Sequence, residues 1–107
     1  MQPERYGRPV LIVTGSIRAR SDTIDQVISL SLDHVRRSRQ EPGCLLHSVH
    51  RDVEDPLRLV FLEHWQDAAA LRVHFRVPAS GAFVNEASAF ADGPPEMAIF
   101  DAQPVSL

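Results

Sequence analysis

The chain has 107 residues, of which 44% are hydrophobic, and a formal net charge of −3 at pH 7. These values are typical of one globular domain and argue against a disordered segment or a nucleic-acid partner. No apolar run approaches the roughly 18 residues of a membrane span, so we expect no membrane association.

The first predicted strand lies near the start of the chain, over residues 9–18. These residues are rich in β-branched side chains, which favour strands. Gly15 lies inside this run and predicts either a bulge or the close approach of another group. We expect a polar arm over residues 1–8, a single folded domain over residues 9–103 and a short tail over residues 104–107.

A helix is predicted to follow this strand. Ser21 and Asp22 have the side chains of a helix N-cap, and apolar residues then recur at helical spacing as far as Val35. The Pro42-Gly43 pair ends the helix.

Two further strands are predicted over residues 44–51 and 59–65. The residues between them, 52–56, have the composition of a turn, so the two strands form an antiparallel hairpin. The only cysteine, Cys44, begins the first of them. It cannot form an internal disulfide, and the N-terminus has no apolar signal segment, so we expect a protein of the reducing cytoplasm.

Two short helices and a last strand complete the pattern. Asp67 is a predicted N-cap for a helix that places Leu71, His74 and Phe75 on one face and ends before Pro78. A further helix is capped by Ser80, and its predicted inward residues are Phe83, Val84, Ala87 and Phe90. The last strand covers residues 97–100.

The element order predicts the architecture. With right-handed crossovers, the series β-α-β-β-α-α-β forms a four-stranded antiparallel sheet with the helices on one face. This is an α+β ferredoxin-like sandwich.

The strands are apolar on both sides, although helices can cover only one face of such a sheet. In residues 59–62, for example, Leu59 and Phe61 point one way, and Val60 and Leu62 point the other. A large exposed apolar face is not tolerated on a soluble monomer. We therefore predict a homodimer packed sheet to sheet. The alternative is a monomer whose tail folds over the sheet.

Several short motifs, taken in order, resemble the antibiotic biosynthesis monooxygenase domain. That family has an E-P-G-C segment, an R-D-x-x-D-P hairpin, F-x-x-E-x-W in the third strand and A-L-x-x-H in the following helix. The matching residues are Glu41-Pro42-Gly43-Cys44, Arg51-Asp52 with Asp55-Pro56, Phe61 with Leu62-Glu63-His64-Trp65, and Ala70-Leu71-Arg72-Val73-His74. The resemblance runs from about residue 9 to residue 103.

The resemblance implies a dimeric α/β barrel and an activity. Family enzymes include small monooxygenases that oxidise quinols or anthrones with molecular oxygen and use no metal, flavin or haem cofactor. The substrate itself is the reductant, so the protein has to bind aromatic rings, favour the substrate anion and exclude water. The haem-degrading branch has its iron-ligating His at the position of Val84, so the resemblance does not imply haem.

His74 is the candidate catalytic residue. It matches the His of the family helix, and an imidazole can accept a substrate proton or bind an oxyanion near neutral pH. The alternative is a His that satisfies a buried backbone group between helix and sheet.

Trp65 is a candidate substrate-binding residue, because an indole can stack on an aromatic ligand. The alternative is a Trp of the core or of the dimer interface. Glu63 shares its strand face, and we expect it to form an ion pair with an Arg rather than to act in catalysis.

No metal site is predicted. His47 and His50 lie three residues apart on a strand and point to opposite faces, and no two histidines have the i, i+4 spacing of a helical metal site. His47 is placed instead in the wall of a cavity between sheet and helices. The remaining predicted lining residues are Leu11, Val13, Leu71, His74, Phe75, Phe83 and Phe90.

Two functions remain open. One is a cofactor-independent monooxygenase acting on a phenolic, quinol or anthrone-like molecule. The other is a non-catalytic dimeric module that binds a small aromatic molecule or has a structural role. Several active family members carry an Asn in the first strand near Gly15, and a glycine lacks that polar contact, which favours the second function.

Overall fold

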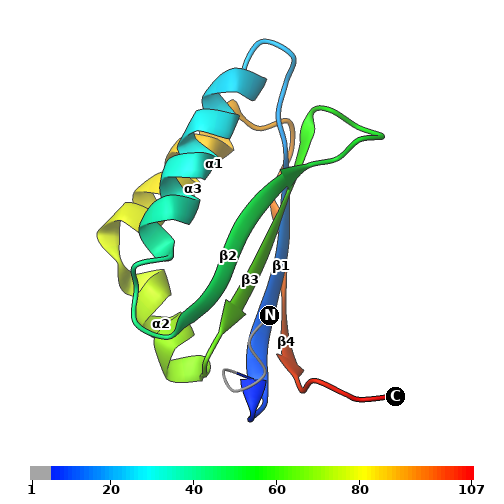
Figure 1. Cartoon of the computed structure of the whole chain (residues 1–107). Coiled ribbons are helices and arrows are strands. Elements are labelled where there is room, and N and C mark those ends of the chain that lie inside the picture. The colour runs from blue at the N-terminus through cyan, green and yellow to red at the C-terminus, as the bar shows by residue number, and fades with distance from the viewer. Residues whose placement is uncertain (1–5) are drawn as a thin grey trace.

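The computed structural model describes residues 6–107. The elements, in chain order, are β1 (Val10–Arg18), α1 (Ile24–Ser38), β2 (Cys44–Arg51), β3 (Arg58–Trp65), α2 (Ala68–Arg76), α3 (Pro78–Phe90) and β4 (Glu96–Ala102). The strands form one sheet in the order β2-β3-β1-β4, and all neighbouring strands are antiparallel. The three helices lie together on one face (Figure 1). The predicted α+β ferredoxin-like fold is confirmed.

The core lies between the helices and the face of the sheet that they cover. Its larger cluster includes Ile17 and Phe61 from the sheet with Val27 and Ala87 from α1 and α3. A second cluster, of Val13, Trp65 and Leu71, lies toward α2.

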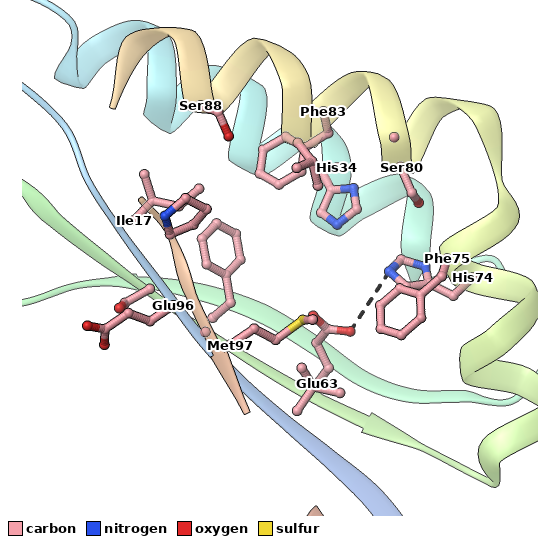
Figure 2. A pocket seen from close by; sticks show the side chains of 17 residues that line it. Ile17, His34, Glu63, His74, Phe75, Ser80, Phe83, Ser88, Glu96 and Met97 are labelled. Carbon is pink, nitrogen blue, oxygen red and sulfur yellow. Dashed lines mark ion pairs between the residues drawn. The ribbon is translucent and has the colours of Figure 1, made fainter. Parts of the chain in front are cut away.

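Histidines contact both clusters. The His34 ring is stacked on Phe83 with their centroids 4.2 Å apart, and His74 lies 4.6 Å from Trp65 (both His34 and His74 are labelled in Figure 2). Polar rings are thus built into the interior of this small domain.

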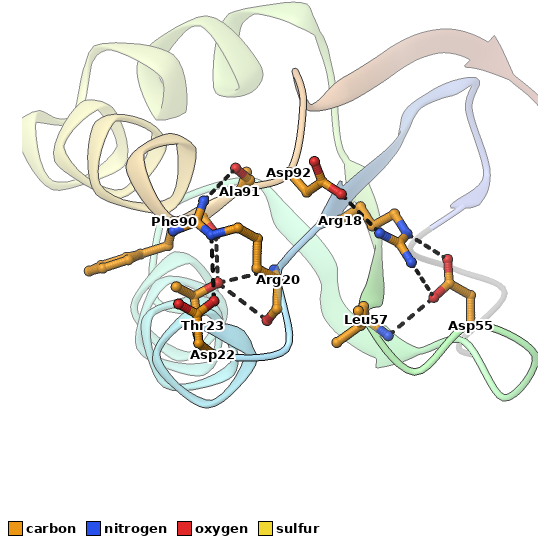
Figure 3. Close-up of polar contacts among 9 residues, drawn as sticks. All are labelled: Arg18, Arg20, Asp22, Thr23, Asp55, Leu57, Phe90, Ala91 and Asp92. Atoms are coloured by element: carbon orange, nitrogen blue, oxygen red, sulfur yellow. Dashed lines mark hydrogen bonds and ion pairs between the residues drawn. The ribbon is translucent and has the colours of Figure 1, made fainter.

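Two of the predicted helix caps are wrong. The N-cap of α1 is Thr23, not Ser21 or Asp22, and the Thr23 hydroxyl donates to the Phe90 carbonyl at 2.7 Å (Figure 3). The start of α1 is thus tied both to the preceding turn, where Thr23 accepts the Arg20 N–H, and to the end of α3.

Helix α3 also begins earlier than predicted. Its first residue is Pro78, so Ser80 lies inside the helix and does not cap it. Proline suits that position because its missing N–H would have no helical partner there. The Asp67 cap of α2 is confirmed, since its carboxylate accepts the Ala70 N–H at 2.8 Å.

The other face of the sheet carries no helix. Tyr6 packs there, and its hydroxyl lies 2.9 Å from His64 Nδ1. Residues 1–5 of the predicted arm fall outside the described residues. On β4, Phe100 pairs with Ile12 on this face and is more than half exposed. In Figure 1 the C-terminal residues extend away from the sheet and do not cover it. The homodimer stays a prediction. Of the helices described, none is long and apolar enough to span a membrane.

Candidate functional site

A pocket of about 330 Å³ lies between the sheet and the helices (Figure 2). Most of its wall is apolar, and its polar side chains include His34 from α1, Glu63 from β3 and His74 from α2. The sheet side and the segment before β4 contribute Val13, Gly15, Ser16, Ile17, Phe61, Glu63, Pro95, Glu96 and Met97. The helices contribute His34, His74, Phe75, Ser80, Gly81, Phe83, Val84 and Ser88.

His74 is held in a fixed orientation at one end of the pocket. It shares the buried face of α2 with Leu71 and is only 3% exposed. Its Nδ1 lies 2.9 Å from Glu41 Oε1, and an ionised carboxylate only accepts hydrogen bonds. The proton of a neutral His74 therefore sits on Nδ1, which leaves the Nε2 lone pair available.

Glu63 lies at the centre of the polar contacts. Its Oε1 accepts the Trp65 Nε1–H at 2.8 Å and lies 3.4 Å from His47 Nε2 and 3.9 Å from His74 Nε2. Burial acts to raise the pKa of Glu63, but the interactions with His47, Trp65 and His74 outweigh it, so that its pKa is lowered. Glu63 is thus a buried carboxylate held ionised by its neighbours. The partners of Glu63 in the described residues are Trp65, His47 and His74, and not the expected Arg.

His34 belongs to the same group of polar side chains as Glu63 and His74, and it was not predicted from the sequence. Its Nδ1 lies 2.7 Å from an Arg37 guanidinium nitrogen. Burial, followed by repulsion from His47, His74 and Arg37, lowers the pKa of His34 to about 3. His34 is therefore neutral at physiological pH. Its place on the buried stripe of α1, seven residues after Val27, was the signal that would have found it.

The histidines of α1, β2 and α2 meet in one cluster. The ring centroids of His34, His47 and His74 lie between 5.2 and 5.6 Å apart, and one nitrogen of each lies within 4.8 Å of the others. Spacing along the chain excludes a metal site only among histidines that are close in sequence, whereas these three come together through the fold.

The predicted site residues divide into two groups. His74, Phe75 and Phe83 line the pocket, as does Val13. The other predicted residues lie outside its wall: Leu11, Leu71 and Trp65 belong to the smaller core cluster, Phe90 packs on the larger one, and His47 is buried behind the pocket against Trp65. The hydrogen bond from Trp65 to Glu63 gives the indole a supporting position rather than a stacking surface.

Gly15 forms part of the pocket wall. A Cβ added to it would lie 3.3 Å from the Glu96 carbonyl oxygen. The close approach predicted for this glycine is thus confirmed, while the pairing of β1 continues without a bulge on both sides.

Known proteins are similar to this chain in sequence. A family model described as antibiotic biosynthesis monooxygenase matches residues 10–86. A Synechocystis sp. protein described as uncharacterized is 32% identical over 90 residues, or 84% of this chain, and the chain spans 61% of that relative.

Solved structures agree with the family match. A crystal structure of an antibiotic biosynthesis monooxygenase is 32% identical, with a TM-score of 0.81, over 88% of this chain and 99% of the other. A conserved protein from Methanosarcina mazei Go1 has the same fold, with a TM-score of 0.87 at 20% identity, over 95% of this chain and 100% of the other. All the motifs quoted from the sequence fall inside the matched range of residues, so the chain belongs to the antibiotic biosynthesis monooxygenase family.

Proposed function

We propose that the pocket binds a phenolic, quinol or anthrone-like aromatic molecule and that the protein oxidises it with molecular oxygen. The observation that carries the proposal is the position of His74, whose Nδ1 is held by Glu41 and whose ring lines a mostly apolar pocket. A volume of about 330 Å³ is within the range of small-molecule sites.

His74 takes the substrate proton in this proposal. Its Nε2 accepts the proton of an acidic O–H or ring C–H, and the ionised Glu41 stabilises the imidazolium that forms. Apolar walls exclude water from the resulting anion. The cationic guanidinium of Arg37, which contacts His34, adds a favourable charge nearby.

The substrate supplies the electrons. Conversion of an activated ring CH₂ to C=O takes one O₂, of which one oxygen atom joins carbon and the other leaves as water. The CH₂ group gives up four electrons and O₂ accepts them, so no further reductant is required. The protein has to bind, deprotonate and shield the substrate.

Oxygen uptake tests the proposal. Tag-free protein in excess EDTA is supplied with a panel of anthrones and hydroquinones, and wild type is compared with His74→Ala. The matched control is His50→Ala, an exposed histidine on β2. We expect uptake above the uncatalysed rate that falls by roughly 100-fold or more in His74→Ala and is unchanged in the control. Equal rates for wild type and His74→Ala would contradict the proposal.

A binding module without catalysis is the second candidate. Gly15 favours it, because a glycine adds no polar side chain of its own to the pocket wall. Folded protein that consumes no oxygen, but whose melting temperature rises with the same aromatic compounds, would support this candidate instead.

A further inference from the structure

We propose that His34, His47 and His74, with Glu63, bind one divalent transition-metal ion at the floor of the pocket. The proposal depends on the geometry of these side chains and not on the oxidation proposed above. Four separate elements, α1, β2, α2 and β3, each supply one ligand.

The side chain of His47 points to a missing ligand. It is fully buried, and its Nδ1 has no hydrogen-bond partner among residues 6–107, while its Nε2 has only the ion-pair contact with Glu63 at 3.4 Å. A buried polar group without a partner destabilises a fold. His47 Nε2 lies in the cluster, 3.4 Å from Glu63 Oε1, where an ion would satisfy both atoms.

His74 already has the surroundings of a metal ligand. Metal-bound histidines typically donate the hydrogen of their other nitrogen to a carboxylate, which fixes the ring. Glu41 takes this place at Nδ1, while His74 Nε2 faces Glu63 at 3.9 Å.

The spacing of the nitrogens requires only a local adjustment. A tetrahedral ion bound at about 2.1 Å from each nitrogen places them about 3.4 Å apart, whereas the three nitrogens here lie within 4.8 Å of one another. Binding therefore requires the three imidazoles to draw closer together than they lie here. Three imidazoles with one carboxylate suit Zn²⁺, Co²⁺, Ni²⁺, Cu²⁺ or Fe²⁺ rather than Mg²⁺ or Ca²⁺.

Arg37 opposes the ion. Its guanidinium lies 2.7 Å from His34 Nδ1 and can only donate, so it favours the tautomer of His34 that carries its proton on Nε2. Binding through Nε2 therefore requires Arg37 to release His34. A glutamine at position 37 has an oxygen that can accept the Nδ1–H, and it carries no charge.

Metal binding is measured directly on tag-free wild-type protein freed of metal by EDTA and dialysis. Co²⁺ is added first, because its visible absorption reports the coordination geometry, and Zn²⁺ is then titrated by calorimetry. We expect one ion per chain. Glu41→Gln is expected to weaken binding by roughly 10-fold, and His47→Gln by more.

Two further variants separate this site from other histidines. His50→Gln, on the exposed end of β2, should bind like wild type, whereas Arg37→Gln should bind more tightly. Both comparisons remain decisive if His47→Gln does not fold. Failure of wild type to bind Zn²⁺, Co²⁺, Ni²⁺ or Cu²⁺, or equal affinities in wild type and Arg37→Gln, would overturn the proposal. Because the oxidation assay contains EDTA, its result is independent of this one.

Discussion

Glu41 Oε1 lies 2.9 Å from His74 Nδ1, although the two residues are 33 positions apart in the chain. Glu41 belongs to the turn that follows α1, and His74 faces that turn from α2. The turn places Gly43 against α2, and a Cβ on Gly43 would lie 2.5 Å from the Ala70 Cβ. Gly43 has a φ of 81°, which favours glycine. The E-P-G-C motif therefore orients the candidate base.

Replacing Glu41 tests this orientation. In Glu41→Gln the amide can donate to Nδ1, which moves the imidazole proton to Nε2. His74 Nε2 then has no lone pair with which to accept the substrate proton. We expect kcat of the proposed oxidation to fall by about 10- to 100-fold with KM nearly unchanged. Glu41→Asp, which keeps the carboxylate, should recover part of kcat. A change in KM alone would show that Glu41 only shapes the pocket.

The hydrogen bond from Trp65 to Glu63 is expected to stabilise the fold. Trp65→Phe keeps an aromatic ring but removes the donor and leaves space in the core. We expect the free energy of unfolding to fall by about 2–4 kcal/mol, measured by urea denaturation with circular dichroism. Val73→Ala, at an exposed position of α2, is the control and should change it by less than about 1 kcal/mol. Equal losses in the two variants would contradict the role of Trp65.

The sequence predicted the elements and topology because these depend on local patterns. β-Branched composition and turn residues marked the strands, helical spacing marked α1, and Asp67 capped the helix that carries His74. The wrong caps have another origin. The Thr23 hydroxyl accepts the Arg20 N–H locally and donates to the Phe90 carbonyl, 67 positions away, and no local pattern contains this second bond.

The polar cluster was only partly predictable for the same reason. His74 was found because it continues a family motif, whereas His34 lies in no quoted motif. Sequence spacing can exclude a metal site within one helix or strand, but it says nothing about three histidines that meet from α1, β2 and α2. Their contact follows from the packing of α1 against the sheet.

Acid is expected to weaken the contacts at the end of β1. Arg18 lies 3.0 Å from both Asp55 and Asp92 (Figure 3), and its hydrogen bond lowers the pKa of Asp55 below the ordinary 3.8. A lowered aspartate pKa adds stability above the ordinary value, and this stability is lost as the pH falls through the lowered one.

The Arg18→Gln variant isolates this effect. Its unfolding free energy should lie below that of wild type at pH 7, and the difference should shrink below about pH 4. Urea titrations at several pH values measure it. Arg72→Gln, on the exposed side of α2, serves as the control. A difference that stays constant down to pH 2 would show that the ion pair is not its source.

The uncovered face of the sheet is expected to form the homodimer. Ile12 pairs with Phe100 and His64 across the strands, and Leu62 lies on the same face opposite Thr14. Sedimentation should give twice the chain mass of 11.9 kDa for wild type and a monomer for Leu62→Lys, because a charge cannot be buried there without a partner. Val73→Lys, on α2, should leave the dimer intact. A monomeric wild type would refute the interface.

Gly15 gives the sharpest comparison between catalysis and simple binding. Gly15→Asn adds an amide to the pocket wall, while Gly15→Ala adds only the Cβ. The Cβ contact at 3.3 Å is with the Glu96 carbonyl, which lies at the start of the edge strand β4. Since β4 has a neighbour only on its β1 side, it can shift slightly, and we expect both variants to stay within about 1 kcal/mol of wild type in stability.

If the missing polar contact limits the oxidation, oxygen uptake rises in Gly15→Asn but not in Gly15→Ala. Equal rates in the two variants, with ligand affinity changed in both, would mean that this part of the wall determines shape alone and would favour the binding module.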